Sequence, residues 1–161
     1  MTPLLTACSG FLLAVLWMDL IFDVQVFGQR EVAAELPEQV LASIAGYYRR
    51  ATTTSRPMSR LIALVMVALL SSLGFASIRG HDPAWLLLTS AALAGVPVAL
   101  ALAHTVPCAI RLGGRLDSPA DQTRIARAIC RDHLICFACM LAFLGLWLTH
   151  GLAIGWPSEG Y

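Results

Sequence analysis

Four long apolar segments alternate with shorter polar segments along the chain. The apolar segments cover about residues 3–27, 58–78, 84–104 and 128–150. Because a helix of about 20 apolar residues crosses the hydrocarbon core of a bilayer, each segment is long enough to span a membrane. The pattern therefore predicts an all-α fold, in which residues 1–161 form a single transmembrane domain built as a four-helix bundle.

Local sequence signals predict where the fourth helix begins, where the third helix bends and how the third helix packs. Ser118, Pro119 and Asp121 form a capping box, so the fourth helix is expected to begin outside the membrane. Pro97 predicts a kink in the third helix. That helix also carries a small residue at every fourth position, a stripe that favours close packing against a neighbouring helix: Ala91, Gly95, Ala99 and Ala103.

The polar loop after the first apolar segment contains a further helical pattern over about residues 37–51. Apolar and aromatic side chains recur there with helical spacing: Leu36, Val40, Leu41, Ile44, Tyr47 and Tyr48. The pattern predicts an amphipathic helix. Such a helix either lies at the membrane surface, with its tyrosines at the headgroups, or packs on a partner subunit.

Composition places the chain among polytopic membrane proteins. Hydrophobic residues make up 58% of it and charged residues 13%, whereas soluble domains are about half apolar and a quarter charged. The net charge of +1 and the lack of a basic cluster predict no nucleic-acid partner. All basic residues are arginine, which is typical of GC-rich, bacterial sequences.

The arginines also predict the orientation. Ten of the eleven lie in or beside the loops that follow the first and third apolar segments: Arg30, Arg49, Arg50, Arg56, Arg60, Arg111, Arg115, Arg124, Arg127 and Arg131. The other side has Arg79. The positive-inside rule then places both loops in the cytoplasm. We expect a multi-pass protein of the bacterial inner membrane with both termini on the outer side.

Ionisable side chains inside the apolar segments are the candidate site. Asp19 and Asp23 lie one turn apart in the first segment, His104 ends the third, and His133 lies near the start of the fourth. Charged groups are costly in a membrane, so they are usually paired or functional. We expect these four to meet near the cytoplasmic leaflet, with Arg131 and Asp132 close to them.

Three interpretations of this cluster stay open. It is a structural network, in which Asp23 pairs with Arg131 or Arg60 and Asp132 with Arg127 or Arg131. Alternatively, the carboxylates of Asp19 and Asp23 and the imidazoles of His104 and His133 bind a transition metal, since that donor set suits iron, zinc, copper or manganese. In the third interpretation the six residues bind an organic ligand or relay protons.

The five cysteines change this picture little. Their odd number and uneven spacing do not predict a disulfide framework. His133, Cys136 and Met140 share one helical face, which is compatible with a soft metal such as copper, but free cysteine and methionine are also common core residues. Core filling is the favoured interpretation.

The segments "HTVPCAIRL" (104–112) and "RDHLICF" (131–137), together with the four-span layout, resemble the anthrone-oxygenase-like family of small membrane proteins. The chain departs from that pattern at Cys108, where a polar amide is expected. The resemblance implies oxygenation of an aromatic substrate, with His104 and His133 as site residues.

Two functions follow from these observations and stay open. In one, the protein holds an Asp/His site near the cytoplasmic leaflet that binds a metal or small ligand, with oxidoreductase-like chemistry. In the other, it is a non-catalytic accessory subunit whose cluster is a structural ion-pair network. Its expected partners are the lipid bilayer and either a larger membrane complex or further copies of itself.

Overall fold

The computed structural model describes residues 1–28 and 35–155, and within them every regular element is a helix. Four stretches are long and apolar enough to cross a membrane: Thr2–Phe27, Pro57–Arg79, Ala84–Gly114 and Pro119–Ala153. These findings confirm the predicted all-α class and the presence of four helices long and apolar enough to span a membrane. Arg30, which enters the orientation argument, lies outside the described residues.

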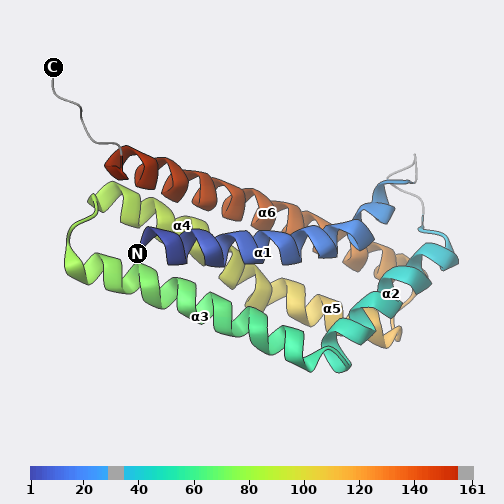
Figure 1. Ribbon diagram of the computed structural model, residues 1–161. Coiled ribbons are helices and arrows are strands. Elements are labelled where there is room, and N and C mark those ends of the chain that lie inside the picture. Colours follow the sequence, from blue (N-terminus) through green and yellow to red (C-terminus); the bar gives the residue numbers. More distant parts are fainter. Residues whose placement is uncertain (29–34, 156–161) are drawn as a thin grey trace, which may run out of the picture.

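The spans run side by side along one axis (Figure 1). They are formed by α1 (Thr2–Asp23), α3 (Arg56–Arg79), α4 (Ala84–Leu100) and α6 (Pro119–Gly155). The N-terminus, the α3–α4 turn and the end of α6 all lie at one end of the bundle. Between the helices lies a cluster of buried apolar side chains: Leu5, Cys8, Leu12, Leu69, Leu73, Leu86, Ala94, Met140, Phe143 and Trp147.

The opposite end of the bundle, which we call the capped end, is closed by two short helices. These are α2 (Glu38–Thr53), which crosses the bundle, and α5 (Val106–Gly114) (Figure 1). The 3-10 turn η1 (Val24–Gly28) continues α1 toward them. A second apolar cluster joins α2, α5 and the first turns of α6: Val26, Leu36, Leu41, Ile44, Ala45, Tyr48, Ala109, Leu112, Ile125, Ala126, Ile129 and Cys130.

Helix α2 occupies nearly the residues predicted for the amphipathic helix. Its predicted apolar face is buried, including Leu41, Ile44 and Tyr48, and it packs on α5 and α6 of the same chain. The contact with α5 is close, because a Cβ placed on Gly113 would lie 2.9 Å from the backbone nitrogen of Arg49. The apolar side chains of α2 are thus partnered within the chain itself.

The third span is longer than the sequence predicted. The helix does not end at residue 104, but passes through a π-helical turn, η2 (Ala101–Thr105), and continues as α5 to Gly114. Pro107 has no N–H group, and its ring excludes the carbonyl four residues back from ordinary helical bonding. The wider turn accommodates this, since the N–H of Val106 bonds to the carbonyl of Ala101, five residues earlier.

The predicted start of α6 is confirmed by its hydrogen bonds. The Ser118 hydroxyl accepts a bond from the backbone N–H of Asp121 at 3.2 Å and donates one to its carboxylate at 2.8 Å. At the C-terminal ends of two helices the chain turns through left-handed backbone conformations, at Gly80 after α3 and at Arg115 after α5. Glycine adopts this conformation readily, so Gly80 suits its position.

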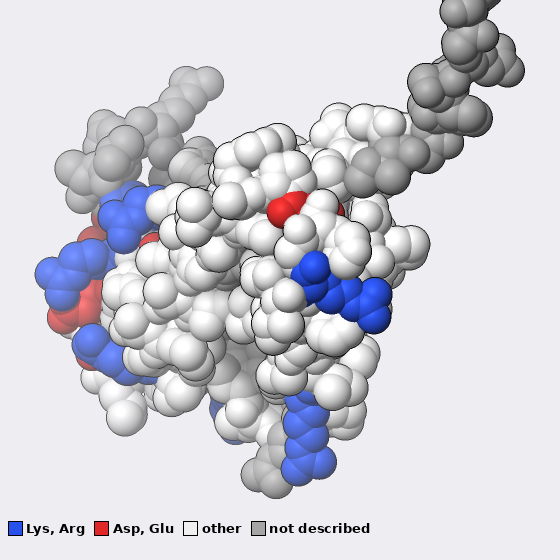
Figure 2. Space-filling view, turned by 90° about the vertical axis from the view of Figure 1, so that its left-hand side faces the viewer, with Lys and Arg blue, Asp and Glu red and all other residues white. Residues whose placement is uncertain are grey.

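The small-residue stripe of α4 does not pack within the bundle. The buried face of α4 consists instead of Leu86, Ser90, Ala94 and Pro97, and Trp147 of α6 donates a hydrogen bond to the Ser90 hydroxyl at 2.9 Å. The residues of the stripe lie on the outer surface. Figure 2 views the bundle from the end that holds the N-terminus, and most of the described surface in this view is uncharged.

Candidate functional site

Asp23 is the centre of a buried network near the capped end. It is the last residue of α1 and has no exposed surface. Its Oδ2 lies 2.5 Å from Nδ1 of His133 on α6, and its Oδ1 accepts a hydrogen bond of 2.5 Å from the Tyr48 hydroxyl on α2. The partners of this carboxylate are therefore an imidazole and a phenol, rather than the predicted Arg131 or Arg60.

Asp19 lies one turn earlier on the same helix and has a similar partner. Its Oδ1 accepts a hydrogen bond from the Tyr47 hydroxyl. The Tyr47 ring stacks on Phe22 with centroids 4.1 Å apart, and it meets the Tyr48 ring edge-on at 5.3 Å. Two adjacent tyrosines of α2 thus bind the two aspartates of α1.

Both tyrosines lie outside the spans, and both phenols resist ionisation. Burial raises the pKa of Tyr47 and of Tyr48, and the charges of the carboxylates that they contact raise each pKa further. The phenols therefore stay protonated and keep donating to Asp19 and Asp23 well above neutral pH.

His104 and Asp132 form a second imidazole–carboxylate pair. Nδ1 of His104 lies 2.5 Å from Oδ2 of Asp132, and the Thr105 hydroxyl donates to the same oxygen at 3.1 Å. The other oxygen of Asp132 lies 3.5 Å from the Arg131 guanidinium. Asp132 is buried, whereas the His104 side chain is 41% exposed.

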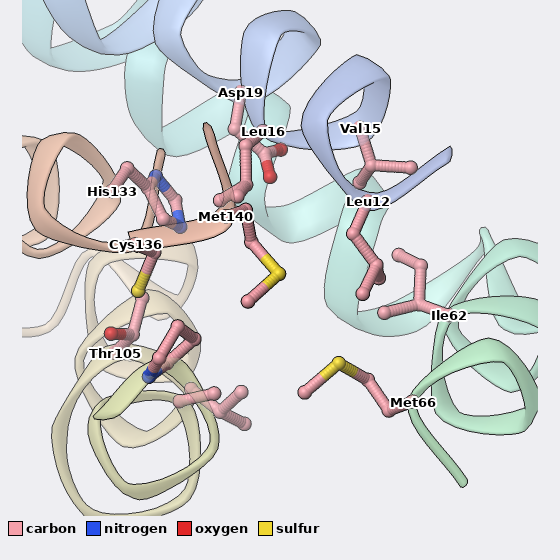
Figure 3. A pocket seen from close by; sticks show the side chains of 13 residues that line it. Leu12, Val15, Leu16, Asp19, Ile62, Met66, Thr105, His133, Cys136 and Met140 are labelled. Carbon is pink, nitrogen blue, oxygen red and sulfur yellow. The ribbon is translucent and has the colours of Figure 1, made fainter. Parts of the chain in front are cut away.

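A cavity of about 220 Å³ lies between the helices beside the first pair. Figure 3 shows Asp19 and His133 projecting into it from α1 and α6, with Thr105 on the far side. Its remaining wall is apolar and comes from all four spans: Leu12, Val15, Leu16, Ile62, Met66, Pro97, Ala101, Val106, Cys136 and Met140. His104 does not line this cavity.

The predicted residues therefore meet as two pairs rather than as one ligand set. Asp19 and His133 line the cavity and Asp23 pairs with His133, while His104, Asp132 and Arg131 form the second group. Among the residues that the structure describes, no three or more His, Cys, Asp or Glu side chains are placed to hold a metal ion together.

The pair at the cavity has the geometry of an acid–base dyad. A carboxylate that accepts a hydrogen bond from Nδ1–H fixes the tautomer and orientation of an imidazole. Nε2 of His133 is then the nitrogen with a free lone pair. Because His133 lines the cavity, a molecule bound there would lie beside this ring.

Sequence reasoning missed several of these partners. Tyr47 and Tyr48 were expected at the lipid headgroups or on a partner subunit, and nothing in their helical spacing connects them to Asp19 and Asp23. The sequence also gives no partner for His150, whose Nε2 lies 3.1 Å from Oδ1 of Asp82. Both contacts join segments that are distant in sequence, so a pattern within one segment gives no signal for them.

Comparisons with protein-family models, with curated proteins and with solved structures find no match to this chain. The site itself is therefore the basis for inferring the function.

Proposed function

We propose that the protein binds an aromatic small molecule within the membrane and that His133 removes a proton from a hydroxyl group of that molecule. The observation that carries the proposal is that His133, which pairs with Asp23, lines a largely apolar cavity together with Asp19. Such cavities, with few well-placed polar groups, are the usual form of small-molecule sites. We place this site near the cytoplasmic leaflet of a bacterial inner membrane.

The proton transfer follows from the environment of His133. Asp23 accepts from Nδ1–H, so Nε2 acts as the general base toward the ligand hydroxyl. The imidazolium that forms is stabilised by the Asp23 carboxylate and by Asp19, which lines the same cavity. Tyr48 supports the base indirectly, because its hydrogen bond fixes the carboxylate of Asp23.

The size and lining of the cavity indicate the ligand class. An apolar cavity of about 150 Å³ binds benzene, so a cavity of about 220 Å³ has room for a molecule of one or two aromatic rings. Proton removal makes such a ring electron-rich, which favours attack by dioxygen. The proposal is thus compatible with the oxygenation of an aromatic substrate that the anthrone-oxygenase-like resemblance implies.

The proposal is tested with 2-naphthol, whose neutral and ionised forms have different absorption spectra. The purified protein is placed in lipid nanodiscs and titrated with the probe, with empty nanodiscs as the blank for partition into lipid. We expect the wild type to bind 2-naphthol and shift its spectrum toward the ionised form. The variant His133→Gln is expected to bind the probe without that shift.

His150→Gln is the matched control, because His150 lies on the same helix and also pairs with an aspartate, but does not line the cavity. It is expected to behave as the wild type. Ala101→Phe, which fills the cavity wall, is expected to weaken binding. Equal spectral shifts in wild type and His133→Gln, or no saturable binding to the wild type, would contradict the proposal.

The alternative function, a non-catalytic accessory subunit, is favoured by a different observation. The small-residue stripe of α4 lies on the outer surface, where a Cβ placed on Gly95 would meet no atom of another helix within 4 Å. Such stripes serve close helix–helix contacts in membranes. If the stripe binds a partner subunit or another copy, Gly95→Leu will reduce the mass of the complex isolated in mild detergent, whereas the binding-site proposal predicts no such change.

A further inference from the structure

A thiol lies next to the imidazole of the second imidazole–carboxylate pair. Sγ of Cys108 lies 3.7 Å from Nε2 of His104, and Nδ1 of the same ring contacts Asp132 at 2.5 Å. The three side chains therefore form a chain from thiol to imidazole to carboxylate. This is the arrangement of a cysteine nucleophile with its base and the group that orients the base.

The local backbone brings these groups together. His104 lies in the π-helical turn η2, and Cys108 lies in the first turn of α5, four residues later. Residues four apart on a helix share a face. Thr105 holds the Asp132 carboxylate from the same turn, and π-helical turns occur frequently at functional sites. The turn therefore aligns all three groups of the chain.

The thiol lies on a different face from the cavity of the proposed function. Neither Cys108 nor His104 lines that cavity. Instead, the His104 side chain is 41% exposed, and its neighbours on the helix surface, Ala103 and Pro107, are also exposed. In a membrane-spanning helix this exposed surface faces lipid, so the molecule that reaches it most readily carries a hydrocarbon chain.

We propose that Cys108 accepts a fatty acyl group from an acyl thioester, with His104 as the base and Asp132 as the residue that positions it. His104 takes the thiol proton, and the sulfur attacks the thioester carbonyl carbon. The new carbon–sulfur bond forms, the bond to the leaving thiol breaks, and that thiol receives the proton from His104. No redox step is needed.

The test uses the full-length protein in nanodiscs with palmitoyl-coenzyme A as the probe. Acylation is measured as the rate at which a palmitoyl group, removable by hydroxylamine, appears on the peptide containing Cys108. We expect modification of the wild type and none at this peptide in Cys108→Ala. His104→Gln is expected to slow the reaction on the order of 100-fold, the typical contribution of a general base.

Cys139 provides the matched control, since it is also a half-buried free thiol but has no imidazole partner in the described residues. Cys139→Ser is expected to leave acylation of Cys108 unchanged. A second readout needs no variant: Cys108 of the wild type is expected to react with N-ethylmaleimide faster than Cys139 at pH 6.5, because His104 lies where it can accept the thiol proton during the reaction. Unmodified Cys108, equal rates in His104→Gln and wild type, or slower alkylation at Cys108 would each overturn the proposal.

Discussion

Single residues in this protein owe their roles to partners from other helices. Asp23 is costly in a membrane by itself, but here it accepts one hydrogen bond from Tyr48 and contacts the His133 imidazole. Each of these groups is buried, so the loss of one partner leaves the others unsatisfied at a cost of about 1–3 kcal/mol per group. Burial and hydrogen bonding together make this network specific.

Tyr47 and Tyr48 are expected to stay protonated in the folded protein at alkaline pH. Since burial and the nearby carboxylates raise the pKa of Tyr47 and Tyr48, we expect neither phenol to ionise as the pH passes 10, the ordinary tyrosine value. Unfolding exposes both phenols, so they then titrate near that value. The measurement is absorbance at 295 nm during an alkaline titration, in native and denatured protein.

The raised pKa values of Tyr47 and Tyr48 make the stability of the fold depend on pH. A raised pKa in the folded state means that the protonated phenols contribute stability below about pH 10. That contribution is lost as the pH rises toward the folded-state pKa. The variant with Tyr47→Phe and Tyr48→Phe is expected to show the same native titration as the wild type. A loss of titrating groups in the native double variant would contradict the assignment.

At the scale of elements, the capped end depends on a close contact between α2 and α5. Gly113 has no room for a side chain, because a Cβ there would lie 2.9 Å and 3.0 Å from the backbone N and Cα atoms of Arg49. Backbone atoms cannot move aside as a flexible side chain can, so the two helices must separate to admit a methyl group.

The prediction is that Gly113→Ala destabilises the fold by about 1–3 kcal/mol. Gly114→Ala is the matched control, since a Cβ at that position meets no atom within 4 Å. Unfolding in a denaturant series in detergent, followed by circular dichroism, measures both variants. Equal stability of the two would show that α2 and α5 do not meet at Gly113.

Comparing predicted and observed helices shows which features of the fold could be predicted from the sequence. Hydrophobic length predicted the four spans, and the Ser118–Asp121 box predicted the start of α6, because both signals are local. The end of the third span was misplaced at residue 104, since the π-helical turn that accommodates Pro107 has no such local signal. The stripe on α4 was assigned to packing within the bundle, but spacing does not reveal which face of a helix is covered.

In the candidate site, too, some features could be predicted from the sequence and others depend on tertiary packing. Asp19, Asp23, His104 and His133 were expected to meet near the cytoplasmic leaflet. The structure pairs Asp23 with His133 but His104 with Asp132. The hydrogen bonds of the two α1 aspartates with Tyr47 and Tyr48 were not predicted. These contacts depend on how α2 crosses the bundle (Figure 1), which is a tertiary property.

At the scale of the whole molecule, the fold places the N-terminus, the α3–α4 turn and the end of α6 together, opposite the capped end (Figure 1). The positive-inside rule predicts that the capped end is cytoplasmic. The test uses variants without native cysteines, with one introduced at His81→Cys in the α3–α4 turn or at Leu116→Cys between α5 and α6. Both positions are exposed.

A membrane-impermeant maleimide added to intact spheroplasts is expected to label the residue introduced by His81→Cys. Leu116→Cys is expected to react after the membrane is permeabilised. The opposite pattern would invert the orientation and place the site near the outer leaflet.

The protonation state of the His133 ring tests the central claim most directly. Solid-state ¹⁵N NMR of histidine-labelled protein in bilayers at pH 8, with His133→Gln used to assign the signal, distinguishes the two tautomers. We predict a proton on Nδ1, held by Asp23, a bare Nε2, and a shift of the Nε2 signal when 2-naphthol is added. A proton on Nε2 with a bare Nδ1, or no response to the probe, would contradict a base that Asp23 aims into the cavity.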